Sequence, residues 1–192
     1  MVSGPHLVCA HTGMLAYDPK AKDGFGSGVV VGNGKCVITA AHVVDAVSLS
    51  DIKVFENKVQ NDMIVPTGNT ISVARVTKHP YYKGTSEPHE GGSAFDMAVV
   101  ELTTKMEANP WKVSQTRGKI HQNTTLYGWG TLTASPSKYP EQLRSGANKI
   151  VSTSDRGCKQ WYEIVGAICM MNEDGTAVGL NCGGDLGGGG QL

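Results

Sequence analysis

Short runs of β-branched and other apolar residues, separated by turn-forming residues, limit the folds that this chain can adopt. Gly, Pro, Asn and Asp stand between the runs at fairly even spacing, a pattern typical of an all-β barrel or sandwich. We therefore predict an all-β protein, with short helices only after His42 and over 158–165. The expected strands cover 28–32, 36–40, 51–55, 70–77, 97–102, 124–130, 147–153 and 164–171.

The stretch 103–123 is polar, poorly periodic and centrally placed. We interpret it as a linker between two halves of the chain. With 192 residues, the chain is long enough for one sizeable domain or for two small domains that share an interface.

Charge and hydropathy argue against several classes of partner. Lys and Arg together number 17, as do Asp and Glu, and no long run of one charge occurs, so we expect neither nucleic acid nor an anionic membrane as a partner. No apolar stretch approaches the length of a membrane span. The first residues lack a positively charged segment followed by an apolar one, so we expect no signal peptide within this chain.

Cysteine and asparagine patterns bear on the compartment. The five cysteines are an odd number, so at least one is unpaired or bonded outside the chain. The triplet Asn123-Thr124-Thr125 permits N-glycosylation if the chain is secreted, although such triplets also occur by chance.

A metal site is the one cofactor alternative that the N-terminal residues raise. His6, Cys9 and His11 carry zinc-binding atoms close together in the sequence. No motif places a fourth ligand nearby, and alternation along a strand puts His6 and His11 on opposite faces. We predict an ordinary strand with a buried cysteine, and neither a metal nor another cofactor.

Two polar residues stand beside predicted strands, where catalytic side chains can lie. His42 follows the strand over 36–40, and Asp96 comes immediately before the strand over 97–102. Taken singly, each also fits a structural role, as a core or turn histidine and as a turn or cap aspartate. The chain closes on a glycine-rich loop, "NCGGDLGGGGQL", over 181–192.

Together these segments are far more specific than any of them alone. The order of "TAAH", "FDMAVVEL", "GWG" and "GDLGG" resembles that of the trypsin/chymotrypsin-like serine endopeptidases. "MVSG" at the start, "HPYYKG" and the stretch from "YPEQ" to "CKQWY" extend the resemblance over almost the whole chain. It implies two six-stranded antiparallel β-barrels, approximately 1–110 and 120–192, and a Cys158–Cys169 disulfide.

The resemblance also implies a role for each polar residue. His42 would be the general base, and Asp96, within hydrogen-bond reach or one water of it, would orient the imidazole and stabilise its charged form. The backbone amides of Gly184 and of residue 186 would form the oxyanion hole, because glycine permits a tight turn and a close approach.

The chain departs from the family pattern in its last residues. Leu186 occupies the nucleophile position, and loss of the nucleophile in such a triad lowers turnover by about six orders of magnitude. Leu180 stands where an acidic residue gives tryptic members their preference for Lys or Arg, so we expect an apolar pocket. The sequence stops at Leu192, before the family's final strands and helix, so we expect an incomplete second barrel and no family partner for Cys182. Asp185, which pairs with the N-terminal amine in active members, is expected to find some partner or to become exposed.

These observations lead to three hypotheses. The first is a secreted, catalytically inactive trypsin-like homologue that acts on a protein or peptide partner by binding or regulation. The second is an active serine endopeptidase in which Leu186 and the short C-terminus are artefacts of the sequence. The third is a non-functional fragment.

Overall fold

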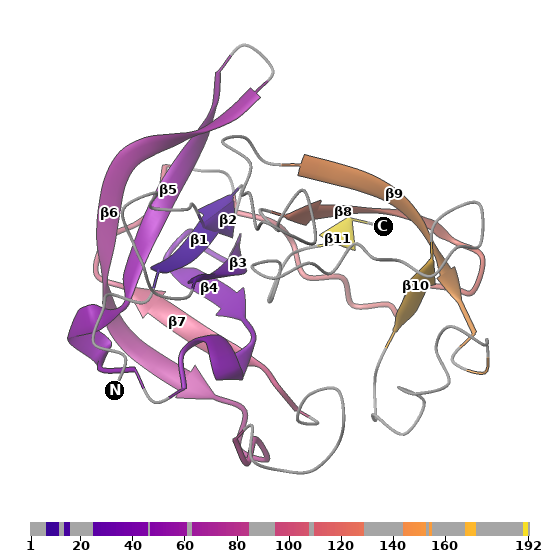
Figure 1. The fold of residues 1–192 in the computed structure, drawn as a ribbon, viewed down its shortest axis with the longest axis horizontal. Coiled ribbons are helices and arrows are strands. Elements are labelled where there is room, and N and C mark those ends of the chain that lie inside the picture. Colours follow the sequence, from indigo (N-terminus) through magenta and orange to yellow (C-terminus); the bar gives the residue numbers. More distant parts are fainter. Residues whose placement is uncertain are drawn as a thin grey trace, which may run out of the picture.

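β-Strands dominate the protein in the computed structural model (Figure 1). Among the described residues, the helical elements are two short 3-10 turns, η1 (Ala41–Val43) and η2 (Leu49–Asp51). In the described part of the chain, no helix has the length and apolar character needed to cross a membrane. The structure describes residues 7–11, 14–15, 25–45, 47–60, 63–84, 95–107, 110–128, 144–152, 154, 168–171 and 190–191.

The first sheet has seven strands in the order β2-β1-β3-β4-β7-β6-β5. Alternating burial along β4 and β7 turns Val37, Val100 and Leu102 inward, as the period-2 side-chain geometry of a half-buried strand requires. The strands are β1 (Leu7–His11), β2 (Met14–Leu15), β3 (Phe25–Val31), β4 (Cys36–Thr39), β5 (Lys53–Gln60), β6 (Met63–Lys78) and β7 (Ala98–Leu102).

Strand β1 makes this sheet curl round on itself. It pairs with β3 and also with β5, so that Leu7 lies opposite both Phe25 and Lys53. Both pairings are parallel, whereas the remaining ladders of this sheet are antiparallel. Residues 12–24, about the dozen that a parallel connection needs, separate β1 from β3. The family resemblance implied a six-stranded antiparallel barrel, so the seven strands of this sheet and the two parallel pairings of β1 depart from that expectation.

The core of the first sheet also includes part of the predicted linker. Met106 is 1% exposed, and its backbone N–H donates to the Gly34 carbonyl. Further along, Trp111 forms a parallel bridge with Val31 and donates from its backbone N–H to the Val30 carbonyl. The first part of the stretch 103–123 is therefore packed on the first sheet and is not a free connection.

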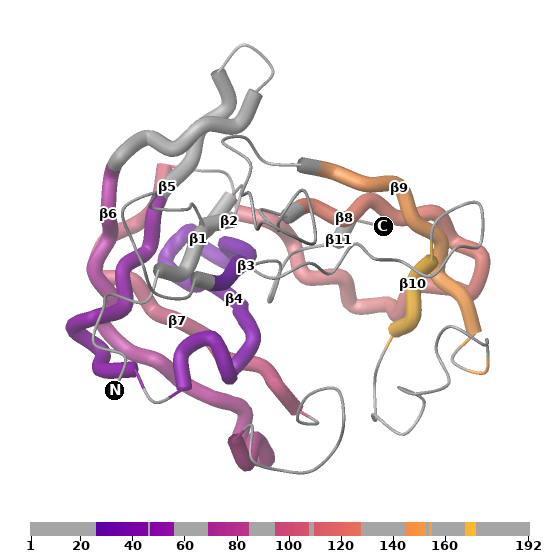
Figure 2. The backbone as a smooth tube through the Cα atoms, in the orientation of Figure 1, coloured from indigo at the N-terminus to yellow at the C-terminus, as the bar shows by residue number. Residues whose placement is uncertain are grey.

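The second sheet has four strands in the order β10-β9-β8-β11, all antiparallel. It lies beside the first sheet (Figure 1), and the described parts of both can be followed along the chain in Figure 2. The ring of Tyr127 in β8 meets the ring of Trp111 edge to face at 5.8 Å between centroids, and thereby joins the two sheets. The strands are β8 (Asn123–Gly128), β9 (Arg144–Val151), β10 (Cys169–Met171) and β11 (Gly190–Gln191).

These two sheets, the second of them partial, confirm the predicted all-β fold class. The predicted helix over 158–165 lies outside the described residues. The division of the chain into 1–110 and 120–192 stays a prediction.

Candidate active site

The turn that carries His42 packs tightly against the first sheet. β4 ends at Thr39, and η1 follows at once, with its Ala41 and Val43 side chains buried. Val43 faces Gly26 of β3 so closely that a Cβ atom at position 26 would lie 2.4 Å from the Val43 Cγ1. The absence of a side chain at Gly26 therefore lets η1 sit directly on β3, which fixes the height of His42 above the sheet.

Asp96 stands at the entrance to β7, after an unusual backbone conformation. Phe95 has a φ of 63°, a left-handed value that is uncommon for a residue with a Cβ and clusters at functional sites. The next residues are held by β6, because the His79 N–H donates to the Met97 carbonyl at 2.8 Å and Lys78 lies opposite Ala98.

His42 and Asp96, 54 positions apart in the sequence, make two hydrogen bonds to each other. The backbone N–H of His42 donates to Asp96 Oδ1 at 2.8 Å, and His42 Nδ1 lies 2.5 Å from Asp96 Oδ2. Their side chains are 25% and 20% exposed, so the pair is largely shielded but open to solvent on one side. The structure thus brings together the two residues that the sequence analysis singled out, because their strands, β4 and β7, pair in the first sheet.

Each partner shifts the pKa of the other. The hydrogen bond to Asp96 raises the pKa of His42 above its ordinary value of 6.5, against the effect of burial, and the charges of Asp96 and Asp45 add to the rise. Burial acts to raise the pKa of Asp96, but hydrogen bonds from the His42 side chain and backbone outweigh it and lower that pKa below 3.8. The arrangement stabilises an ionised carboxylate beside an imidazolium.

A second polar cluster, missed from the sequence, borders this pair. Lys78 Nζ lies 2.5 Å from Asp45 Oδ1, and the Tyr82 hydroxyl donates to Asp45 Oδ2 at 3.4 Å. Burial, followed by the charges of Asp45 and Asp96, raises the pKa of Tyr82 to about 12. Asp45 comes three residues after His42, while Lys78 and Tyr82 come from the end of β6 and the turn beyond it. No sequence spacing signals that these segments meet.

The remaining predicted site residues lie outside the described part of the chain. They are Leu180, Gly184, Asp185 and Leu186. Cys169 is disulfide-bonded and Cys36 is a free thiol, while Cys158, the predicted partner of Cys169, is also outside. His6 is outside as well, and no group of three or more His, Cys, Asp or Glu that could hold a metal occurs in the described residues.

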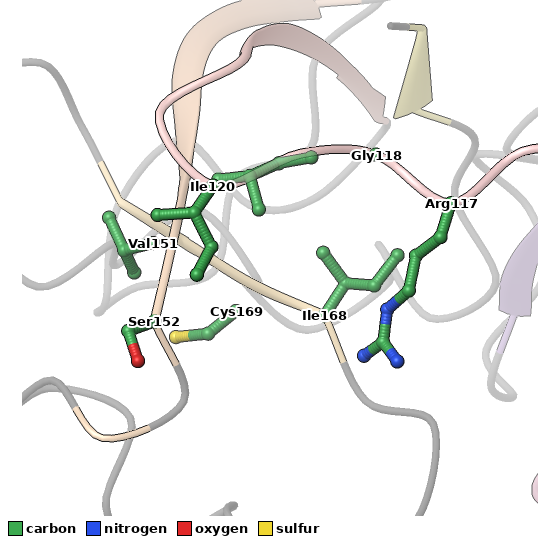
Figure 3. Close-up of a pocket in the computed structure, with 8 residues that line it drawn as sticks. Arg117, Gly118, Ile120, Val151, Ser152, Ile168 and Cys169 are labelled. Atoms are coloured by element: carbon green, nitrogen blue, oxygen red, sulfur yellow. The ribbon is translucent and has the colours of Figure 1, made fainter.

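A small pocket opens in the second sheet, away from the His42–Asp96 pair. Its volume is about 260 Å³, and Figure 3 shows Ile120, Val151 and Ile168 around it with Arg117 to one side. It contains none of the residues that the sequence analysis singled out for catalysis, and we assign it no role.

Comparison with solved structures shows the same fold in a protein of known structure. Neuropsin, described as a serine protease expressed in the limbic system of mouse brain, matches with a TM-score of 0.64 and 24% sequence identity. The match covers 85% of this chain and 70% of the neuropsin chain. At this identity the likeness shows the fold, a double β-barrel of the serine protease kind.

Sequence comparison goes one step further. A sequence model described as Trypsin matches residues 11–189, so the chain belongs to the trypsin/chymotrypsin-like serine endopeptidase family. Kallikrein-8 of Mus musculus is 27% identical over 172 residues, which is 84% of this chain and 60% of that protein. Trypsin Blo t 3 of Blomia tropicalis is 24% identical over 155 residues, 77% of this chain and 54% of that protein. The chain thus spans little more than half the length of these relatives.

Proposed function

We propose that this chain is a catalytically inactive member of its family, which binds a protein or peptide partner without hydrolysing it. The observation that carries the proposal is Leu186, a hydrocarbon side chain at the position where the family resemblance places the nucleophile. A leucine neither attacks a carbonyl carbon nor yields a proton to a base. His42 is then a base without a hydroxyl to deprotonate, and Asp96 retains only its role of orienting the imidazole.

An active-site-directed fluorophosphonate probe tests this proposal directly. The probe forms a covalent bond with an activated serine, so trypsin, run in parallel as the positive control, is labelled. We expect the chain to remain unlabelled under the same conditions. Labelling of any residue within 176–192, located by peptide mass mapping, would contradict the proposal.

One observation favours the second candidate, an active serine endopeptidase. The doubly hydrogen-bonded His42–Asp96 pair has the geometry that a working general base requires. Sequencing of the source transcript separates the two candidates, because a serine codon at position 186 supports the enzyme and a leucine codon supports the binding protein. A cooperative thermal unfolding transition of the 192-residue chain would argue against the third candidate, a non-functional fragment.

We also propose that the protein is secreted. The support is the disulfide at Cys169, since disulfides persist in oxidising compartments and are rare in the cytosol.

A further inference from the structure

We propose that the segment 78–82 positions the His42–Asp96 pair, because it holds both of the elements that carry the pair. The proposal rests on the assignment of His42 and Asp96 as the site pair. It concerns Lys78, His79 and Tyr82 as positioning residues, since none of them touches the atoms of the His42–Asp96 hydrogen bonds.

One set of contacts holds the turn that carries His42. Asp45 closes this turn through its backbone N–H, which donates to the His42 carbonyl at 3.4 Å. The Asp45 carboxylate accepts two hydrogen bonds, one from the Lys78 ammonium on Oδ1 and one from the Tyr82 hydroxyl on Oδ2. The Lys78 ammonium also lies 5.9 Å from the centre of the Tyr82 ring. The end of β6 is thereby tied to the chain immediately after His42.

A second set of contacts holds the chain around Asp96. The His79 ring stacks on the Phe95 ring at 4.8 Å between centroids and an interplanar angle of 10°. Tyr81 meets Phe95 edge to face at 5.4 Å. The His79 N–H donates to the Met97 carbonyl, so both neighbours of Asp96 in the sequence contact this segment.

These contacts hold Phe95 in its left-handed backbone conformation. A left-handed backbone conformation is unfavourable for a residue with a Cβ, and it persists only when the surroundings impose it. Phe95 as a residue is 40% exposed, so burial alone does not hold it. The stack on His79 and the hydrogen bond at Met97 supply the constraint that turns Asp96 toward His42.

The test is an NMR titration of His42 in the full chain carrying Lys78→Met and Tyr82→Phe together. If the segment positions the pair, loss of these contacts weakens the hydrogen bond to Asp96, which is the largest cause of the raised His42 pKa. We then expect the His42 pKa to fall toward 6.5 and the low-field Nδ1–H resonance to be lost. A pure charge effect has the opposite sign, since removal of a cation near Asp45 leaves its negative charge less balanced. An unchanged or raised His42 pKa would therefore overturn the proposal.

Further variants separate positioning from mere stability. His79→Ala, which acts on the Asp96 side, should also lower the His42 pKa. Val73→Ala, a core change in β6 at an 8% exposed residue, should lower the melting temperature without moving that pKa. Lys83→Met, an exposed lysine in the same turn, should change neither. The readout needs no catalytic activity, so it stands whether or not the fluorophosphonate probe labels the chain.

Discussion

His42 and Asp96 show how two side chains set each other's ionisation. The folded His42 has a raised pKa, so its contribution to stability is complete below 6.5 and is lost as the pH rises through the folded value. The folded Asp96 has a lowered pKa, so its contribution is complete above 3.8 and is lost as the pH falls through the folded value. The pair therefore stabilises the fold most between pH 3.8 and 6.5.

We predict that Asp96→Asn removes this pH dependence. The amide keeps the approximate shape of the carboxylate but carries no charge, so the His42 pKa should fall toward 6.5. Urea denaturation from pH 3 to 9 should show the stability difference between wild type and variant to be greatest within the window given above. A difference that stays constant across the whole range would show that the pair contributes through shape alone.

At the scale of the elements, β3 and η1 meet closely at Gly26, where a Cβ atom would lie 2.4 Å from the Val43 Cγ1. We predict that Gly26→Ala destabilises the protein by about 1–3 kcal/mol, because its Cβ would overlap the Val43 side chain. Val43→Ala in the same chain should make room, so the double variant should be more stable than the sum of the two single changes. Urea denaturation of the four proteins measures this coupling, and strict additivity would contradict it.

The segment after β7 carries a second prediction at this scale. Met106→Ala should cost about 2–5 kcal/mol, because it empties a fully buried position in the core of the first sheet. Val113→Ala, in the same predicted linker but at a 65% exposed residue, is the matched control and should change stability by less than about 0.5 kcal/mol. Equal changes in the free energy of unfolding for the two variants would show that the whole stretch 103–123 behaves as one linker, as the sequence alone suggested.

The pattern of apolar residues was enough to predict most strands but not their extent. We expected three of the strands, β3, β4 and β7, over 28–32, 36–40 and 97–102. Their sequences either alternate between apolar and polar residues or are apolar throughout. β6 runs from Met63 to Lys78, farther than the expected strand over 70–77, and it includes Pro66. In the structure, Pro66 pairs opposite Asn57, next to an irregularity in β5 between Phe55 and Asn57, and proline is tolerated at such positions.

The site was only partly accessible from the sequence, for a different physical reason. His42 and Asp96 were singled out because a family motif marks them, since no local periodicity brings residues 54 positions apart together. Lys78 and Asp45 carry no such mark, and Tyr82 lies in "HPYYKG", which resembles the family but assigns these three residues no contact. Their meeting depends on how the end of β6 lies against η1 and β7, which is a property of the folded sheet.

For the whole molecule, the proposed secretion leads to a prediction about Asn123. Its side chain is exposed at the start of β8, and Thr125, two residues on, lies on the same face of the strand. We predict that protein secreted from eukaryotic cells carries an N-linked glycan there, removable by an endoglycosidase with a gain in gel mobility. Asn123→Gln and Thr125→Ala should each abolish the shift, whereas Asn69→Gln, at an exposed asparagine outside any such triplet, should keep it. A secreted but unglycosylated wild type would contradict the prediction.

The junction at Trp111 leads to a prediction about motion between the two sheets. Its backbone N–H donates to β3 and its ring contacts Tyr127 of β8, so we expect it to act as a pivot between the two sheets. Rotation about a pivot displaces near points little and distant points more. Interdomain rotations occur on the microsecond to millisecond timescale. We therefore expect relaxation-dispersion exchange to be small at Tyr127 and to grow across the second sheet toward its outer strand, β10.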